Sequence, residues 1–315
     1  MNKDDVIDSL GRIDDHVIQK VNNARLNKGR KCSFRRGISM AACIALVLSI
    51  ALTAEATNGT VSNLLVPIFG GAQTEIVDDI GVPIGASTSV NGYTLTVDAI
   101  IGDRYSVMIG YTLSRDDGQP IPENMSFKSH NMMGSGYSTG IKIDSESPNI
   151  AHFHERWRRN GPLLGRVVTP SFSTLIIDNG EEDDIVVAEG TWELKFTIRY
   201  PDTTEKLPVK DLYVFDETGR KYQVKKILLS SMGIHFDVIE YDPIFGEVSY
   251  IGFKTAVLLK NGTRISLDGG GGGSMSEGDL TRKFSYYGRF DVPIPREDIE
   301  AIIICDTIYE LDNTA

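Results

Sequence analysis

Apolar and polar residues alternate along several short segments after residue 57. In "TWELKFTIRY" every second residue is large and apolar: Trp192, Leu194, Phe196, Ile198 and Tyr200. Because successive side chains of a β-strand point to opposite faces, this period of two predicts a strand with one buried and one solvated face. Segments 93–99 and 105–113 show the same period on either side of "IIGDR", which predicts a β-hairpin.

A second series of such segments follows "PDTTEKLPVKD" (201–211), whose two prolines and mixed charges indicate a domain boundary. Turn signals such as "FDETGRKY" and "LKNGTRI" separate the later segments at intervals of about eight to twelve residues. No helical pattern alternates with these strands, so the pattern predicts antiparallel sheets rather than a parallel α/β fold. We therefore expect a mainly β protein with two antiparallel domains, residues 57–200 and 201–315, the second a β-sandwich.

The N-terminal residues follow a different pattern. Apolar residues from Val6 to Val21 recur at intervals of three and four, which predicts an amphipathic helix. Ile38 to Ala54 contains no charged residue, and five basic residues lie within 28–36. A helix over this apolar segment spans about 25 Å, and the arginines before it can reach the bilayer interface. The segment predicts a transmembrane helix, with residues 1–37 in the cytoplasm and the β-domains outside.

Two other readings of this apolar segment stay open. Ala54-Glu55-Ala56 has the small-x-small form of a cleavage site, so the segment could be an export signal removed after Ala56. A buried core helix is also apolar, but it does not need a basic cluster before it. The patterned helix Val6 to Val21 favours an uncleaved anchor, because a discarded leader does not need one.

The distribution of charged residues also changes after residue 37, where the apolar segment begins. Residues 1–37 carry nine Lys/Arg and five Asp, a net charge of +4, whereas the whole chain carries −11 and the remainder therefore −15. An acidic body argues against nucleic-acid binding, which requires a basic face. Of the three cysteines, only Cys305 lies in the body, so we expect the β-domains to fold without an intramolecular disulfide.

"HFHERW" (152–157) is the cluster with metal-ligand character. His152 and His154 would share one strand face, and Glu155 could add an oxygen, with His130 and Asp144 as possible further ligands. A stable site needs three or four converging ligands. The alternative is a solvated strand whose charges face water, which we prefer; we assign no metal and no cofactor.

Three other motifs each have a functional and a structural interpretation. "RWRR" (156–159) could bind an anionic polymer or lipid head group, or could simply pack Trp157 into the core. "EEDD" (181–184) lacks the spacing of a calcium loop and is typical of a solvated turn. "GGGGGS" (269–274) lacks the Lys-Ser/Thr of a phosphate loop, and predicts a flexible hairpin loop.

The layout resembles an uncharacterised family of single-pass membrane proteins of Gram-positive bacteria. The resemblance rests on "DVIDSLGRIDDHVIQKV", on "SVNGYTLTVDAIIGDRYSVMIGYTL" with "GTWELKFTI", and on "LPVKDLYVFDETGRKYQVKKILLSSMGIHFDV". It implies an extracytoplasmic domain of unknown function followed by an immunoglobulin-like β-sandwich. It also implies an anti-sigma-factor-like layout, with Val6 to Val21 contacting a sigma factor. The Cys/His zinc motif of one anti-sigma class is absent, since residues 1–37 hold only His16 and Cys32.

No motif for catalysis is present. There is no Gly-x-Ser-x-Gly elbow, and Cys305 lies in an apolar segment without a histidine beside it. We therefore predict a non-enzymatic envelope protein that binds an envelope ligand outside and a cytoplasmic partner inside. The alternative is a structural or adhesive surface protein whose inner segment only anchors.

Overall fold

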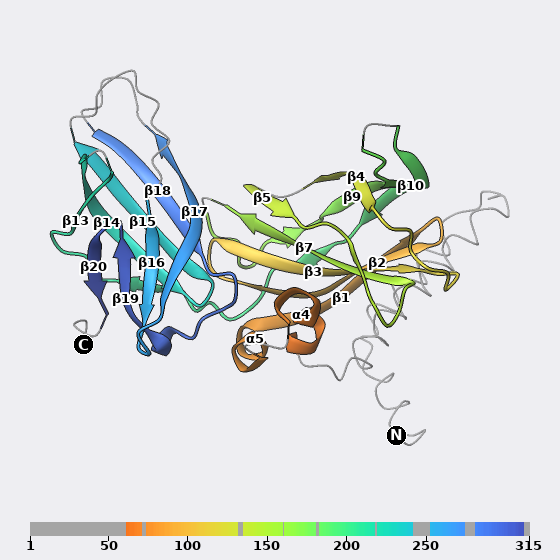
Figure 1. Cartoon of the computed structure of the whole chain (residues 1–315), viewed down its shortest axis with the longest axis horizontal. Coiled ribbons are helices and arrows are strands. Elements are labelled where there is room, and N and C mark those ends of the chain that lie inside the picture. The colour runs from red at the N-terminus through yellow and green to blue at the C-terminus, as the bar shows by residue number, and fades with distance from the viewer. Residues whose placement is uncertain are drawn as a thin grey trace, which may run out of the picture. The chain divides into compact units, whose positions relative to one another are not determined.

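The computed structural model describes residues 61–70, 74–131, 135–159, 161–180, 183–217, 219–241, 253–274 and 281–311. Every described residue belongs to one compact unit of the chain, which lies within Thr53–Ala315. This unit is mainly β, with several antiparallel sheets (Figure 1). The predicted helix Val6 to Val21 and the predicted span Ile38 to Ala54 lie outside the described residues. No helix within the described ranges is both long and apolar enough to cross a membrane.

We refer to residues 81–200 as the first β-region and to residues 205–311 as the second. In the first, a large sheet has the strand order β1-β2-β3-β7-β5, with β6 also on β7, and a smaller sheet has the order β10-β9-β4. A short pair, β11 and β8, completes it. The bounds are β1 Gly81–Val90, β2 Tyr93–Gly102, β3 Ser106–Arg115, β4 Met125–Asn131, β5 Ser135–Ser138, β6 Lys142–Ile143, β7 Ile150–Arg158, β8 Val167–Val168, β9 Ser171–Ile177, β10 Ile185–Glu193 and β11 Phe196–Thr197.

The first core lies between these sheets and confirms the alternation seen in the sequence. Trp192 is fully buried, and Leu194 and Ile198 are at most 1% exposed, while Lys195 between them is exposed. The Trp192 indole Nε1 donates to the Tyr93 carbonyl at 2.9 Å. The predicted hairpin is also present, because β2 pairs antiparallel with β3.

Two helices, α4 (Val61–Phe69) and α5 (Thr74–Ile80), precede the first strand and cover part of the opposite face of the large sheet. Leu65 of α4 is fully buried against it. A Cβ at Gly110 of β3 would lie 2.8 Å from Leu65 Cδ2, so glycine at this position permits the close approach of helix and strand.

The second β-region has the strand order β12-β14-β15-β18-β17-β16-β19-β20, with β13 also paired to β14. Its core includes the buried rings of Tyr222, Phe236 and Phe290. The bounds are β12 Glu205–Leu207, β13 Tyr213–Phe215, β14 Lys221–Ser230, β15 Gly233–Tyr241, β16 Thr255–Leu259, β17 Arg264–Ser274, β18 Thr281–Arg289, the 3₁₀ helix η1 Arg296–Asp298, β19 Ile299–Ile304 and β20 Thr307–Glu310.

The glycine run at residues 269–274 is a strand, so the expected flexible loop was wrong. It is the second half of β17 and pairs with β18, from Gly269 opposite Gly288 to Ser274 opposite Lys283. A Cβ at Gly269 would lie 2.3 Å from the Tyr287 carbonyl oxygen, which leaves no space for a side chain. Glycine has a low intrinsic propensity for strands, and here the pairing with β18 outweighs it.

Candidate functional site

The two β-regions meet around Asp103, in the turn between β2 and β3, where its side chain is almost fully buried. Its Oδ1 accepts hydrogen bonds from the backbone N–H of Ser106 at 2.8 Å and of Tyr105 at 2.9 Å, which fixes the turn. Its Oδ2 accepts from Ser230 Oγ at 2.9 Å and from Tyr287 OH at 3.3 Å, both in the second β-region. We refer to this contact as the seam.

Buried hydroxyl groups extend the network at the seam. Ser106 Oγ lies 2.7 Å from Tyr287 OH, and Tyr200 OH lies 2.8 Å from the Asp103 carbonyl oxygen. Burial, assisted by the negative charge of Asp103, raises the pKa of Tyr200 and of Tyr287 well above the ordinary value. Both phenols therefore stay protonated and remain hydrogen-bond donors at physiological pH.

Two arginines of β7 bridge the seam. Arg156 donates from its two terminal nitrogens to the carbonyl oxygens of Phe290 and Asp291, each at 3.1 Å. Arg158 donates from Nη1 to the Gly270 carbonyl oxygen at 2.8 Å. These acceptors are main-chain carbonyl oxygens, and the bonds orient the two guanidinium groups.

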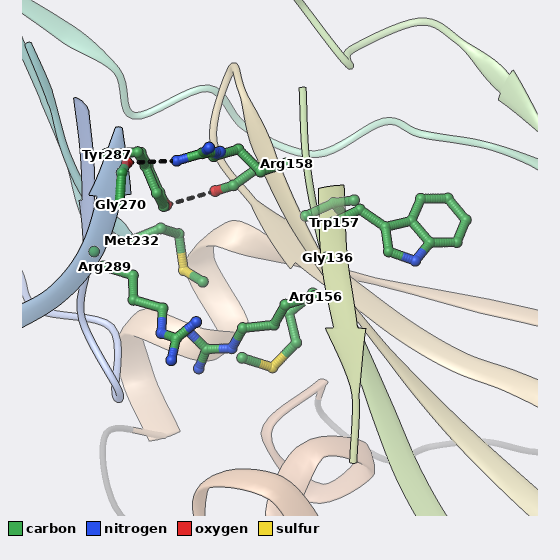
Figure 2. Close-up of a pocket in the computed structure, with 12 residues that line it drawn as sticks. Gly136, Arg156, Trp157, Arg158, Met232, Gly270, Tyr287 and Arg289 are labelled. Atoms are coloured by element: carbon green, nitrogen blue, oxygen red, sulfur yellow. Dashed lines mark hydrogen bonds between the residues drawn. The ribbon is translucent and has the colours of Figure 1, made fainter. Parts of the chain in front are cut away.

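A pocket of about 410 Å³ opens at the seam beside these arginines. Figure 2 shows the side chains of Arg156 and Arg289 extending toward each other from the two β-regions, while the Trp157 indole points away. Among the lining residues three are arginines and none is an aspartate or glutamate. The lining residues are Ser106, Val107, Met108, Gly136, Arg156, Trp157, Arg158, Met232, Gly269, Gly270, Tyr287 and Arg289.

Strand alternation explains the placement of the β7 side chains. Residues at odd positions of this strand are buried, whereas His154, Arg156 and Arg158 are partly exposed on the opposite face. The structure thus separates the "RWRR" motif: Trp157 packs into the first core, as the structural alternative expected, and its two neighbouring arginines line the pocket.

The candidate metal ligands do not converge. His152 and His154 share the partly exposed face of β7, whereas Glu155 points to the other face and is fully buried. His152 Nδ1 lies 3.0 Å from Thr112 Oγ1, and its Nε2 lies 3.6 Å from Asp144 Oδ2. In the part of the chain that the structure describes, no group of three or more His, Cys, Asp or Glu residues could hold a metal ion.

Glu155 is instead a carboxyl group inside the first core. Its Oε2 accepts from Tyr111 OH at 2.9 Å and from Trp157 Nε1 at 3.1 Å, and its Oε1 lies 4.0 Å from His130 Nε2. Burial raises the pKa of Glu155 to about 7, against the lowering effect of the two hydrogen bonds. Burial likewise raises the pKa of Asp98, on β2, to about 7.

Burial has the opposite effect on the histidines, because it disfavours the charged form of any group. It lowers the pKa of His154 to about 4, with a further contribution from the positive charge of Arg156. It also lowers the pKa of His152, although Asp144 opposes the shift. Of the acidic motif, Asp183 and Asp184 are exposed, and residues 181–182 lie outside the described ranges.

Comparison with known proteins adds little. No family model matches the chain, and no curated protein does so. A crystal structure of a conserved domain protein from Bacillus anthracis matches with a TM-score of 0.44 and 15% sequence identity, covering 71% of this chain and 76% of that chain. A match at this level carries no argument about the function of this chain.

Proposed function

We propose that this chain is a non-enzymatic, single-pass membrane protein whose outer β-regions bind an envelope ligand in the seam pocket. The observation that carries the proposal is the pocket itself: its walls come from β3, β5 and β7 of the first β-region and from β17 and β18 of the second. Its volume of about 410 Å³ lies within the range of small-molecule sites. A ligand there contacts both β-regions at once.

A ligand held between two β-regions changes the free energy of the contact between them. Ligand binding stabilises whichever arrangement offers more contacts. The seam already contains buried polar groups from both sides, including Asp103 and Tyr287, so a small displacement there breaks several hydrogen bonds together. This is the property that a receptor needs to report occupancy.

The remaining parts of the proposal rest on the sequence. Ile38 to Ala54 is the anchor, residues 1–37 are cytoplasmic, and residues 57–315 are extracytoplasmic. Val6 to Val21 forms a helix that contacts a cytoplasmic partner such as a sigma factor, as the family resemblance implies. The second β-region is the immunoglobulin-like domain of that layout, a proposal that agrees with its antiparallel strands.

A thermal-stability screen tests ligand binding. Full-length protein in an uncharged detergent is mixed with small-molecule fractions of bacterial envelope, and its melting temperature is measured. A fraction that supplies ligand at a hundred times its Kd should stabilise the protein by about 2.7 kcal/mol. Met232→Trp, which fills the pocket, should abolish the shift, whereas Val167→Trp on the exposed surface of β8 should not.

A second experiment separates signalling from a structural or adhesive role. Scrambling the residues from Val6 to Val21 with their composition kept should abolish the response of the cell to the active fraction while leaving the protein in the membrane. An unchanged response would instead favour the structural or adhesive function. If no envelope fraction stabilises the protein, the receptor proposal fails.

A further inference from the structure

We propose that the seam pocket is specific for a ligand that carries an oxyanion group on a small apolar body, with Arg156 and Arg289 as the anion-binding residues. This inference rests on the proposed function, that the pocket binds a ligand, and adds the chemical class. The shared chemistry is a phosphate or carboxylate oxygen group, whether it belongs to a free metabolite or to a lipid head group.

The charge of the pocket is opposite to that of the protein around it. The chain carries a net charge of −11, yet three of the twelve lining residues are arginines and none is acidic. Asp103 does not itself line the pocket, but its carboxyl group accepts hydrogen bonds from Ser106 and Tyr287, which do, and from Ser230. A positive pocket in a negative surface concentrates anions locally and selects them from neutral solutes.

The arrangement of the guanidinium groups suits an anion between them. Arg156 and Arg289 extend toward each other across the pocket (Figure 2), so an anion held there contacts a guanidinium group from each β-region. The main-chain bonds of Arg156 to Phe290 and Asp291 hold its guanidinium plane in place. A planar, pre-oriented guanidinium group is suited to bidentate binding of carboxylate or phosphate.

The field of Arg156 is already felt by a neighbouring side chain. Its positive charge contributes, after burial, to the lowered pKa of His154, two residues away on the same face of β7. Arg156 is itself partly buried, and a partly buried charge attracts an anion more strongly than one at an open surface.

The apolar lining residues determine which nonpolar group of a ligand the pocket can hold. Met108 and Met232 are almost fully buried, and both line the pocket. Flexible, polarizable thioethers accommodate small apolar groups of varied shape. The site therefore combines a charged end with an adaptable apolar wall, which fits a compact amphipathic anion better than inorganic phosphate alone.

Titration calorimetry on the full-length protein in an uncharged detergent tests this specificity. The probes are phenyl phosphate, benzoate, their uncharged counterpart benzyl alcohol, inorganic phosphate, and dihexanoyl phosphatidylglycerol as a soluble lipid phosphate. We expect phenyl phosphate or benzoate to bind, and benzyl alcohol to bind at least tenfold more weakly. Binding of the lipid alone among the anions also supports the inference and identifies a head group as the source.

Arg289→Gln should raise the Kd for the bound anion about tenfold, because a charge-assisted hydrogen bond contributes roughly that factor. Arg199→Gln removes the same charge from an exposed position outside the pocket and should leave the Kd unchanged. If Arg289→Gln does not fold, as judged by its melting curve, Arg156→Gln replaces it with the same expectation.

Three outcomes overturn the inference. The first is that no anionic probe binds, and the second is that Arg199→Gln weakens binding as much as the pocket variant does. The third is that benzyl alcohol binds as well as phenyl phosphate. If Met232→Trp abolishes the binding of benzyl alcohol in that case, the pocket remains a ligand site and only the anion specificity fails.

Discussion

The two faces of strand β7 differ in what surrounds their ionisable groups, and neighbouring residues show the difference. Glu155 faces the first core, where Tyr111 and Trp157 donate to it, while His154 faces the opposite side beside Arg156. Burial moves the pKa of Glu155 up to about 7 and that of His154 down to about 4. Both groups are thus driven toward their neutral forms, and their contributions to stability depend on pH with opposite sign.

Removing the large ring from the core face should have the largest effect. Trp157→Ala deletes a side chain that is 1% exposed, which should cost about 3–5 kcal/mol. Lys195→Ala, at an exposed position of the first β-region, should cost under about 0.5 kcal/mol. Denaturant melts at pH 7 measure both. A more damaging Lys195→Ala would show that the assignment of buried and solvated faces is wrong.

Glu155, the acidic residue on the core face, should give the next largest effect on stability. Between its ordinary value of 4.5 and its folded value of about 7, Glu155 keeps a proton that the unfolded chain has released, so stability falls as pH rises through this window. The change is roughly 3 kcal/mol. Glu155→Gln should remove this contribution. Denaturant melts from pH 4 to pH 8 would then show that the free energy of unfolding depends less on pH than in the wild type.

The control for this variant is Glu193→Gln, at an exposed position of β10, which should leave the pH dependence as it is. Asp98 has a raised pKa of the same kind, so the Glu155→Gln protein should retain part of the slope. If the Glu155→Gln protein kept the whole pH dependence of the wild type across this window, the assignment of a buried, protonated carboxyl group would be wrong.

The basic group of the opposite face should give a smaller effect of the other sign. Between pH 4 and its ordinary value of 6.5, His154 stays neutral in the folded protein while the unfolded chain is protonated, so stability increases as pH rises. His154→Gln should therefore reduce the loss of stability between pH 6.5 and pH 4. Partial exposure allows water to screen the ring, and we expect a shift smaller than that of Glu155→Gln. If His154→Gln lost more stability than the wild type between pH 6.5 and pH 4, the predicted sign of the His154 contribution would be wrong.

Local patterns predicted the strands well because a period of two is a property of neighbouring residues. The alternation around Trp192 and the hairpin of β2 and β3 could be read directly. The same rule separates Glu155 from His152 and His154, since residues of odd and even number lie on opposite faces. Applied to "HFHERW", it would have removed Glu155 from the candidate metal site.

The pocket could not be predicted, because it depends on residues that are distant in sequence. "RWRR" drew attention to Arg156 and Arg158, but nothing local connects them with Arg289 or Met232. The glycine run was misjudged for the same reason: its strand conformation depends on pairing with β18 and on the close approach of Gly269 to Tyr287. Within residues 115–185, which lie outside the segments that resemble the family, the structure places strands from β4 to β9.

The buried carboxyl group of Asp103 also joins parts of the chain that are synthesised at different times. Its partners Ser106 and Tyr105 emerge from the ribosome immediately after it, but Tyr287 follows only 184 residues later. At about 5–20 residues per second, that separation corresponds to roughly 10–40 s of synthesis. During this interval the turn can form while Oδ2 still faces water, and the later arrival of Ser230 and Tyr287 encloses it. The contact of Asp103 with the second β-region can therefore form only after most of the chain has been synthesised.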